Sequence, residues 1–512
     1  MTDAQPRARR RDRTQPSTRG PQLPPPLPRL INPWKPLEAV SAEALERIID
    51  GGFRILAEAG LEIMSPRARD LCRQAGAEVD DASQLVRMER GLVEAYVAKA
   101  PREFALAARN PARDLHVGGS TVNFGPVVGA PNINDIERGR RPGDYQAFCD
   151  LIRLNHALGA MHWSGGVVVE PTDLPVPVRH LHMCHGHILY ADIPWAARSI
   201  GRIAVDDAVR MAAIEHGISL DDLARRPSVL AVTNTNSPRR VDEELLDGLM
   251  AMAEYGQAVC ITPFTLAGAM APITLAGALA LQVAEALGIV ALLQMVRPGT
   301  PAVFGGFTSN VDMRTGAPAF GTPEYVRATI AGGQIARRLG LPYRSSGVCS
   351  STNVDAQATY ETGFSLFAAI MSHANLVQHA AGWLEGGLSA SFEKTVIDCE
   401  MLHMWAASMK PIEAGADDLA LDTIMNVPPG GHFFGTAHTM TRFEHAFHQP
   451  IVSDWRNFET WRDAGQPTAT QRAHGVWKKA LADYQPPPLD ASIAEELKDY
   501  VARREREILG AV

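Results

Sequence analysis

The stretch Ala374-Asn-Leu-Val-Gln-His-Ala-Ala-Gly-Trp-Leu-Glu-Gly-Gly-Leu388 begins as an apolar run and stops abruptly at polar, aromatic and acidic residues. Asn375 to Ala381 has the length of a buried strand, and the glycines that follow allow the backbone to turn sharply into a helix. His379, Trp383 and Glu385 would stand at the carboxyl end of that strand, where parallel α/β folds place their chemistry. The alternative is that Trp383 packs against outer helices and Glu385 is a solvated loop carboxylate.

A repeating rhythm surrounds this stretch from Asp144 onward: an amphipathic helix, a short apolar run, and then a polar, glycine-rich turn. Such alternation is typical of parallel strands joined by crossover helices. The candidate strands are Met161 to Glu170, Pro194 to Ile200, Val229 to Thr235, Ala258 to Phe264, Ala302 to Phe307, Leu341 to Ser346, Asn375 to Ala381 and His432 to Thr436. No GxGxxG follows any of them, and an open doubly wound sheet has about five or six strands. The count therefore predicts an α/β fold with a closed (β/α)8 TIM barrel.

The remaining chain predicts three further regions. Residues 1–35 are read as a disordered, basic, Pro- and Arg-rich arm. Residues 36–143 are read as an α-rich N-terminal layer that ends in a hairpin around Gly118-Gly119, and residues 144–442 as the barrel. Residues 443–512 are expected to form a helical C-terminal extension.

Charge and composition exclude several classes of function. The chain of 512 residues has a formal net charge of −8; its first thirty residues hold seven Arg and two Asp, which gives +5 and leaves −13 for the rest. An acidic body argues against nucleic acid and favours cationic ligands. The six cysteines include no CxxC pair, which predicts reduced thiols and a cytoplasmic protein. The apolar stretch from Ala267 to Met295 is broken by Gln282 and Glu285, which indicates a buried helix and no membrane contact.

Two motifs suggest metal chemistry at first sight. The cluster His180-Leu-His-Met-Cys-His-Gly-His187 falls in an early helix and has no HExxH or carboxylate pattern beside it, so polar histidines on a helix face are the favoured interpretation. Asp114-Leu-His-Val-Gly-Gly119 fits the DxHxxG pattern of corrinoid-binding proteins but lies in the expected hairpin and lacks the companion motifs. We therefore predict no metal site and no corrinoid bound by the chain itself.

The strand ends together predict a substrate site. The candidate binding residues are Trp163, Asn234, Asn236, Phe264, Phe307, Ser346, His379, Trp383, Glu385 and His438. Neutral hydrogen-bonding groups, aromatics and a few carboxylates, with no Lys and little Arg, predict a cage for a cation and a poor site for phosphate or carboxylate. The sharpest expectation is that Trp383 and Glu385 hold the cationic head, with Phe264 or Phe307 completing the cage. No Ser or Cys nucleophile is visibly paired with His and Asp.

Several long motifs carry a resemblance to a known family. They are Pro263-Phe-Thr-Leu-Ala-Gly-Ala-Met-Ala-Pro-Ile-Thr-Leu-Ala-Gly-Ala-Leu-Ala280, Asn234-Thr-Asn-Ser-Pro238, Arg297-Pro-Gly299, Phe320-Gly-Thr-Pro-Glu324, Asp355-Ala-Gln357, Ala381-Gly-Trp-Leu-Glu-Gly-Gly387 and Gly430-Gly-His-Phe-Phe-Gly435. With these motifs the sequence resembles the trimethylamine methyltransferase family over roughly residues 35 to 500.

The resemblance implies a (β/α)8 barrel that moves a methyl group from a quaternary or tertiary methylamine to the cobalt of a separate corrinoid protein. The chain shows only ordinary residues, so it resembles the branch without pyrrolysine, which includes glycine betaine methyltransferases; the wall that pyrrolysine would occupy is expected near Ser345 to Thr352. We expect a homo-oligomer with a cognate corrinoid protein as partner. A barrel lyase or hydrolase of another class and a non-catalytic binder of quaternary amines remain as alternatives.

Overall fold

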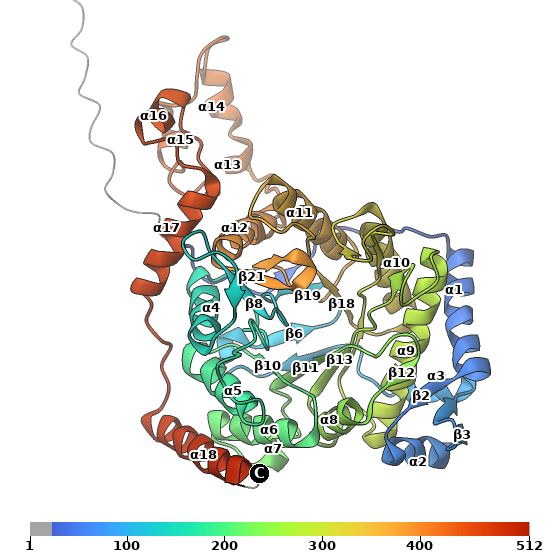
Figure 1. The fold of residues 1–512 in the computed structure, drawn as a ribbon. Coiled ribbons are helices and arrows are strands. Elements are labelled where there is room, and N and C mark those ends of the chain that lie inside the picture. The colour runs from blue at the N-terminus through green and yellow to red at the C-terminus, as the bar shows by residue number, and fades with distance from the viewer. Residues whose placement is uncertain (1–22, 511–512) are drawn as a thin grey trace, which may run out of the picture.

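The computed structural model describes residues 23–510, and its main feature is a curled sheet surrounded by helices (Figure 1). The sheet order is β1-β7-β19-β18-β15-β13-β11-β10. The strands are β1 (Leu30–Ile31), β7 (Thr121–Phe124), β19 (Leu376–Gln378), β18 (Tyr343–Ser346), β15 (Ala302–Gly305), β13 (Ala258–Ile261), β11 (Val229–Thr233) and β10 (Trp195–Ala197). Every neighbouring pair is parallel except β1 with β7. Six of the eight expected strands are therefore present, and all lie in this sheet.

The segment Met161–Gly166 lies between the two edges of the parallel sheet. The backbone N–H of His162 donates to Phe124 O in β7 at 2.8 Å, and that of Ser164 donates to Pro194 O beside β10 at 2.9 Å. The expectation of a regular strand from Met161 to Glu170 is wrong, because Gly165 turns the chain at φ 85° and breaks the ladder. The seven parallel strands and this segment together form a ring of eight extended pieces.

A helix follows each piece of the ring and packs on its outer face (Figure 1). In chain order these are α4 (Tyr145–Leu158), α5 (Arg179–Tyr190), α6 (Arg202–His216), α8 (Glu243–Glu254), α9 (Leu275–Val296), α10 (Pro323–Leu339), α11 (Ala356–Met371) and α12 (Phe392–Ser408), with the short α7 (Leu220–Leu223) after α6. Among the described residues only α9 is long and apolar enough to cross a membrane, and 83% of its most apolar window is buried in the protein. It is a core helix.

The interior of the curled sheet is filled by side chains. Leu230, Cys260, Val303 and Leu376 from the strands pack with Trp163, which lies so close to Gly125 that a Cβ there would sit 2.1 Å from the indole Cζ2. The strand pair β5 (Phe104–Leu106) and β6 (Leu115–Val117) adds Leu106, Leu115 and Val117 to this cluster. Since the N–H of Ala107 bonds to Pro227 O, just before β11, the pair covers the amino ends of the strands. Only the carboxyl ends remain open.

The N-terminal layer packs on the outer face of α9. It consists of α1 (Ala42–Arg54), a π-helical turn (Ile55–Ala59), α2 (Pro66–Ala75), α3 (Arg90–Val97) and the sheet β12-β2-β4-β3, formed by Arg240–Val241, Leu61–Ile63, Leu85–Arg87 and Glu78–Asp80. Gly52 allows this approach, since a Cβ there would meet Val283 Cγ1 at 2.4 Å. Of the expected disordered arm, residues 1–22 lie outside the described residues. Residues 23–35 correct that expectation, because Leu30 is buried in β1 and Leu27 bonds to Gly159 O.

Two small sheets stand above the carboxyl ends of the ring. One has the order β20-β21-β8-β9 and consists of Trp383–Leu384, Ser389–Ser391, Asn132–Asn134 and Arg141–Pro142. The other has the order β14-β16-β17 and consists of Leu266–Ala267, Ser309–Val311 and Pro318–Ala319. Both begin within a few residues of a main strand, so they form walls around the open end.

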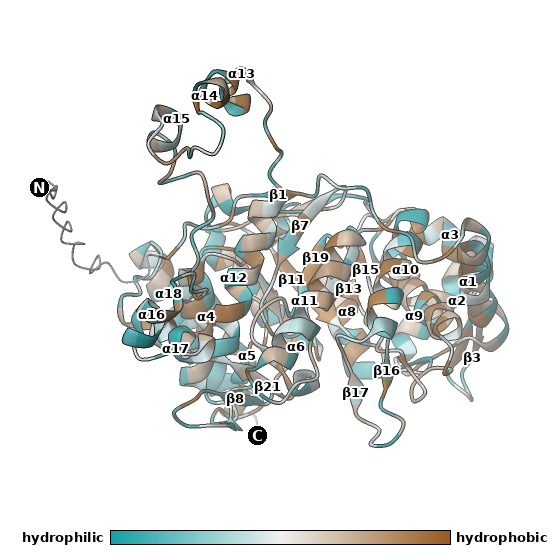
Figure 2. Ribbon diagram, turned by 90° about the horizontal axis from the view of Figure 1, so that it is seen from above, coloured by the Kyte–Doolittle hydropathy of each residue, from teal (hydrophilic) through white to brown (hydrophobic). Residues whose placement is uncertain are grey.

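The last hundred residues separate into an arm and two attached helices (Figure 2). We call residues 411–450 the arm; it contains α13 (Ala416–Leu419), α14 (Leu421–Asn426) and α15 (Ala437–Met440). The strand expected at His432 to Thr436 is absent there, because this segment is exposed and pairs with no strand. After α16 (Phe458–Asp463), α17 (Ala469–Ala482) packs on α12 and α4, and α18 (Ala491–Gly510) packs on α5 and α6.

Candidate functional site

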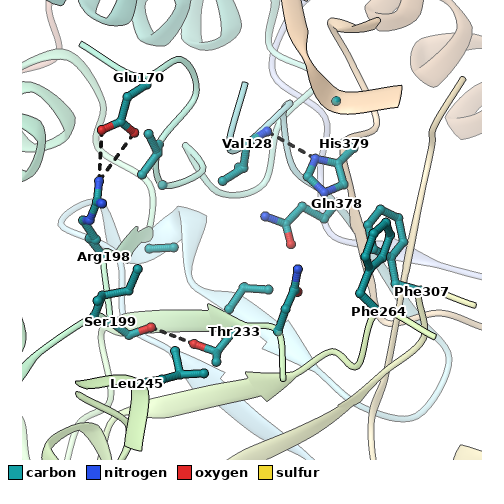
Figure 3. Close-up of a pocket in the computed structure, with 18 of the residues that line it drawn as sticks. Val128, Glu170, Arg198, Ser199, Thr233, Leu245, Phe264, Phe307, Gln378 and His379 are labelled. Carbon is teal, nitrogen blue, oxygen red and sulfur yellow. Dashed lines mark hydrogen bonds and ion pairs between the residues drawn. The ribbon is translucent and has the colours of Figure 1, made fainter. Parts of the chain in front are cut away.

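A cavity of about 840 Å³ opens at the carboxyl ends of the strands (Figure 3). Each main strand from β10 to β19 contributes to its wall. Five do so through a residue at or just after their ends, namely Arg198, Asn234, Phe264, Phe307 and Gln378, and β18 does so through Arg344 inside the strand. Parallel strands align these ends, so residues up to 180 positions apart in the chain meet in one place. The expectation that chemistry-bearing side chains gather at this edge agrees with the cavity.

The cavity has one aromatic wall. The ring centroid of Phe307 lies 5.1 Å from that of Phe264, 5.8 Å from His379 and 6.2 Å from Trp383. Phe320 stacks behind Phe307 at 5.3 Å. Four of these five rings line the cavity directly, and Phe320 supports them from behind. An ammonium group in contact with such faces is attracted by their negative electrostatic potential.

Trp383 is held rigidly against this wall. Its Nε1–H donates to Cys349 O at 3.0 Å, and Gly387 packs so closely on the indole that a Cβ there would lie 2.6 Å from Cη2. The loop before it is fixed by Asp398, which accepts from the N–H of Gly382 at 2.9 Å. Asp398 also pairs with Lys394, which is fully buried. Burial raises the pKa of Asp398 although Lys394 counteracts it.

His379 presents one defined nitrogen to the cavity. Its Nδ1 accepts from the N–H of Val128 at 3.2 Å, so the neutral ring carries its proton on Nε2 (Figure 3). Burial, with a smaller contribution from the positive charge of Arg344, holds the pKa of His379 well below its usual value. His379 is therefore a neutral imidazole whose Nε2–H is available as a donor.

Arg344 is a buried cation on the floor of the cavity, in strand β18, and only 2% exposed. Its Nε and Nη2 donate to Gln378 Oε1 at 3.3 and 3.0 Å, and its Cζ lies 5.1 Å from the ring centroid of Phe307. Its Nη1 is buried and has no hydrogen-bond partner among residues 23–510. Burial lowers the pKa of Arg344, but an arginine stays charged in proteins. An unpartnered buried guanidinium nitrogen is costly unless a ligand completes it.

The opposite rim carries a neutralised acid. Glu170 accepts from Arg198 Nη1 at 3.0 Å and pairs with Arg179 as well (Figure 3). Next to it, Ser199 and Thr233 hydrogen-bond through their hydroxyls at 2.7 Å. Glu170 is therefore shared by two cations, whereas Arg344 has no acid within ion-pair distance among the described residues. The floor of the cavity is positive.

The sequence-predicted residues divide into two groups. Asn234, Asn236, Phe264, Phe307, His379 and Trp383 line the cavity. Trp163, Ser346, Glu385 and His438 do not. Trp163 is buried beneath Gly125 inside the ring. Ser346 is completely buried, and its backbone carbonyl accepts a hydrogen bond from the Tyr325 hydroxyl. Glu385 pairs with Arg140 Nε at 2.8 Å, and His438 lies in the exposed arm, where Nε2 contacts Asp417 O. Placing His438 at the strand ends is wrong, because no strand precedes it.

Sequence reasoning missed Arg344, Gln378 and Arg198, the ion-pair partner of Glu170. The expectation of a site with little Arg needs correction, since Arg344 and Arg198 both line the cavity. A signal was present: Arg344 stands inside the segment Leu341 to Ser346, which was itself predicted to be a strand. A charged residue in a buried strand needs a partner or a ligand. None of residues 345–352 lines the cavity, although Cys349 holds Trp383.

Histidines of the histidine-rich helix bond to separate partners. His180 bonds to Asp207, His182 to Glu505, and His187 to Ser164 and Gly166 O, so the rings point to different partners. Within residues 23–510 no three His, Cys, Asp or Glu side chains gather as a metal site would need. The six cysteines are all free and buried.

Comparison with known proteins places these observations in a family. The sequence model of the trimethylamine methyltransferase family (MTTB) matches residues 5–509. A glycine betaine methyltransferase of Desulfitobacterium hafniense is 37% identical over 470 residues, which cover 92% of this chain and 97% of that protein. A trimethylamine methyltransferase MttB of the same species is 28% identical over 482 residues, covering 92% and 95%. Among solved structures, the monomethylamine methyltransferase MtmB of Methanosarcina barkeri matches with a TM-score of 0.48 at 10% identity, covering 88% and 90%. The chain belongs to the trimethylamine methyltransferase family.

Proposed function

We propose that this protein removes a methyl group from a betaine, a quaternary methylamine that also carries a carboxylate, and passes it to the cobalt of a separate corrinoid protein. Family membership and the two methyltransferase relatives support methyl transfer from a methylated amine. The observation that carries the choice of a betaine is the buried Nη1 of Arg344, which lacks a partner among the described residues.

The carboxylate end of the substrate would bind on the floor of the cavity. Arg344 Nη1 and His379 Nε2–H are the donors there, and Gln378 fixes the guanidinium from the other side. A carboxylate accepts both donors and neutralises the positive floor. Trimethylamine has no carboxylate, and in its protonated form it offers Arg344 no hydrogen-bond acceptor.

The ammonium end would lie against Phe264, Phe307 and Trp383. Methyl groups on a quaternary nitrogen carry part of its charge, and aromatic faces attract them without hydrogen bonds. Cation–π contact in a desolvated cage is worth about 2 kcal/mol or more. Asn234 and Asn236 on the rim complete the polar edge.

Methyl transfer from such a substrate needs little acid–base help from the protein. The N–CH₃ bond breaks with its electron pair left on nitrogen, so a quaternary ammonium departs as a neutral tertiary amine and no proton moves. The nucleophile is the reduced cobalt of the corrinoid protein, which acts as the methyl acceptor. The task left to this chain is to hold the N–CH₃ bond in line with that acceptor and to exclude water, and positioning of this kind can supply several kcal/mol.

Four further expectations belong to this proposal. The ring of seven parallel strands and Met161–Gly166 acts as a closed (β/α)8 barrel that extends from β7 to α12. The N-terminal layer and α17–α18 would be additions to that barrel. The acceptor protein would dock over the carboxyl ends of the strands, where the cavity lies. Six free, buried cysteines favour a reducing compartment such as the cytoplasm.

The proposal is tested by mixing the purified protein with free cob(I)alamin, or with a corrinoid protein reduced to cobalt(I), and following the visible spectrum. Glycine betaine should give methyl transfer, whereas choline and trimethylamine should be at least tenfold slower. Faster transfer from trimethylamine would contradict the betaine assignment. Binding by calorimetry without transfer to either acceptor would favour a binding protein, and loss of activity with a chelator would favour a metal-assisted lyase.

A further inference from the structure

The arm, residues 411–450, has no core of its own. None of its forty residues is buried, although ten large apolar side chains lie between Ile412 and Phe447. Ile412 is 98% exposed, Phe434 81% and Phe447 76%. Figure 2 shows the arm extending away from the body, so the described part of the chain does not cover it. Soluble proteins rarely leave an apolar surface of this size in water.

A second apolar surface lies on the body, close to where the arm begins. Helix α11 exposes Tyr360, Phe364 and Phe367 at helical spacing, and the neighbouring helix α12 exposes Met404. We call these four residues the stripe. Tyr360 and Phe364 are more than half exposed. Met404 of the stripe also lines a groove of about 700 Å³, together with Met401 and Trp455. Aromatic residues in water at i, i+4 and i+7 are typical of a helix face that packs on another element.

In this arrangement the arm does not cover the stripe of its own chain. Helix α12 ends at Ser408, and the arm leaves the body there and returns at Ile451, which is buried again. Lys410, His445 and His448 line one common groove with residues 23–31, so both ends of the arm are fixed side by side on the body. The arm therefore projects as a loop from two neighbouring anchors (Figure 1).

We propose that two copies of this chain exchange arms, so that the arm of each copy covers the stripe of the other. Under two-fold symmetry the arm of each copy packs on the stripe of the other, so the two contacts are identical and both arms and both stripes are covered. The inference does not depend on the substrate or on the methyl acceptor.

A second copy fits better than the acceptor protein as the occupant. No residue of the arm lines the catalytic cavity, whereas the acceptor must dock at its mouth. An acceptor that binds only transiently would also leave the arm exposed to water whenever it is dissociated. The arm and the stripe are both permanent parts of this chain, and a permanent partner keeps both covered.

The area involved is large enough for a stable dimer. Phe433, Phe434, Phe443 and Phe447 are on average more than half exposed. With roughly 150 Å² for each covered phenylalanine, two arms and the surfaces they contact would bury roughly 1,500 Å², within the range of specific interfaces. The six other large apolar side chains of each arm would add to this.

Sedimentation velocity of the full chain at micromolar concentration tests the exchange. The wild-type protein should sediment as a dimer or a larger even-numbered assembly. The double substitution Phe434→Lys/Phe447→Lys in the arm and the single substitution Phe364→Asp in the stripe should each shift most of the protein to the monomer. Mixing the two variants should restore a dimer, because one contact then has its wild-type arm and stripe and the other brings Lys toward Asp.

A matched control is Ile203→Asp, which introduces the same charge at an exposed apolar residue on α6 and should not change the mass. Near-ultraviolet circular dichroism of each variant should match the wild type, which separates lost assembly from lost folding. A monomeric wild-type protein would overturn the proposal, as would a stripe variant that stays dimeric while the arm variant does not. Protection of the arm from hydrogen exchange only after a corrinoid protein is added would assign the arm to that partner instead.

Discussion

The cavity wall and the arm are both rich in aromatic residues and glycines, yet they have opposite environments. Phe264, Phe307 and Trp383 follow strands that are covered by helices, so each ring has neighbours on several sides. The arm segment Gly430-Gly-His-Phe-Phe-Gly435 is also rich in glycine and aromatic residues. However, no strand precedes Phe433 and Phe434, and no helix of the described chain packs on them. Aromatic residues therefore form a binding wall only where a buried strand positions them. Predictions about the two regions can therefore test whether support from the fold, or the aromatic residue itself, decides the effect of a substitution.

The largest contrast is expected between Trp383→Ala and Phe434→Ala. Removing Trp383 deletes a buried indole and its hydrogen bond to Cys349 O, which costs about 3–5 kcal/mol of unfolding free energy and weakens betaine binding at least tenfold. Phe434→Ala should leave betaine affinity unchanged, because the ring is 81% exposed and far along the arm. Isothermal titration and denaturant unfolding measure both effects. Equal losses of affinity in the two variants would contradict the assignment of the cavity.

A comparable loss of stability is expected from Lys394→Met, which tests the support behind Trp383. Lys394 and Asp398 are a fully buried ion pair, and removal of one partner leaves the other charge uncompensated at a cost of about 3–5 kcal/mol. The double variant Lys394→Met/Asp398→Leu should recover much of that stability. It should still bind betaine less well, because Asp398 no longer holds the N–H of Gly382. Full affinity in the double variant would show that the pair does not position Trp383.

The sequence predicted well where local pattern and tertiary support agree. Six apolar runs became strands, and six of the ten predicted site residues line the cavity at their ends. It failed at Met161 to Glu170, where Gly165 turns the backbone, and at His432 to Thr436, where nothing covers the apolar run. It also assigned Thr121–Phe124 to a peripheral hairpin, because pairing of β7 with β19 joins residues some 250 positions apart, and no local pattern reveals such a contact. Arg344 was missed since only burial makes its charge significant.

The attachment of α18 gives a smaller effect that depends on pH. Burial alone would raise the pKa of Asp207, but hydrogen bonds from His180, Arg504 and Tyr500 outweigh it and lower the pKa to about 2. The carboxylate therefore stabilises the fold fully above pH 4, and this contribution is lost as the pH falls toward 2. Asp207→Asn should lower the unfolding free energy by about 2 kcal/mol at pH 7, with the gap to wild type narrowing below about pH 4 and closing only near pH 2. A gap that is constant with pH would mean that the charge is not the cause.

The smallest effect is expected from Glu385→Gln. Glu385 pairs with Arg140 and Ser389 instead of facing the cavity, and ion pairs of this partly exposed kind contribute less than about 1 kcal/mol. Betaine affinity should change less than twofold, and the unfolding free energy by a similarly small amount. A tenfold loss of affinity for betaine, with no loss for 3,3-dimethylbutanoate, which keeps the carboxylate and has an uncharged tert-butyl group in place of the trimethylammonium group, would restore Glu385 as the counter-ion of the ammonium group.

The most direct test of the account is the affinity of wild type and Arg344→Gln for glycine betaine and for choline, which keeps the trimethylammonium group and lacks the carboxylate. A charged hydrogen bond to a buried guanidinium is worth about 1.5–3 kcal/mol, so the substitution should weaken betaine binding about 10- to 100-fold and leave choline binding within about threefold. Titration calorimetry at pH 7.5 gives all four constants on the same protein preparations. If betaine and choline lose affinity equally, Arg344 only supports the cavity floor, and the assignment of a carboxylated substrate is wrong.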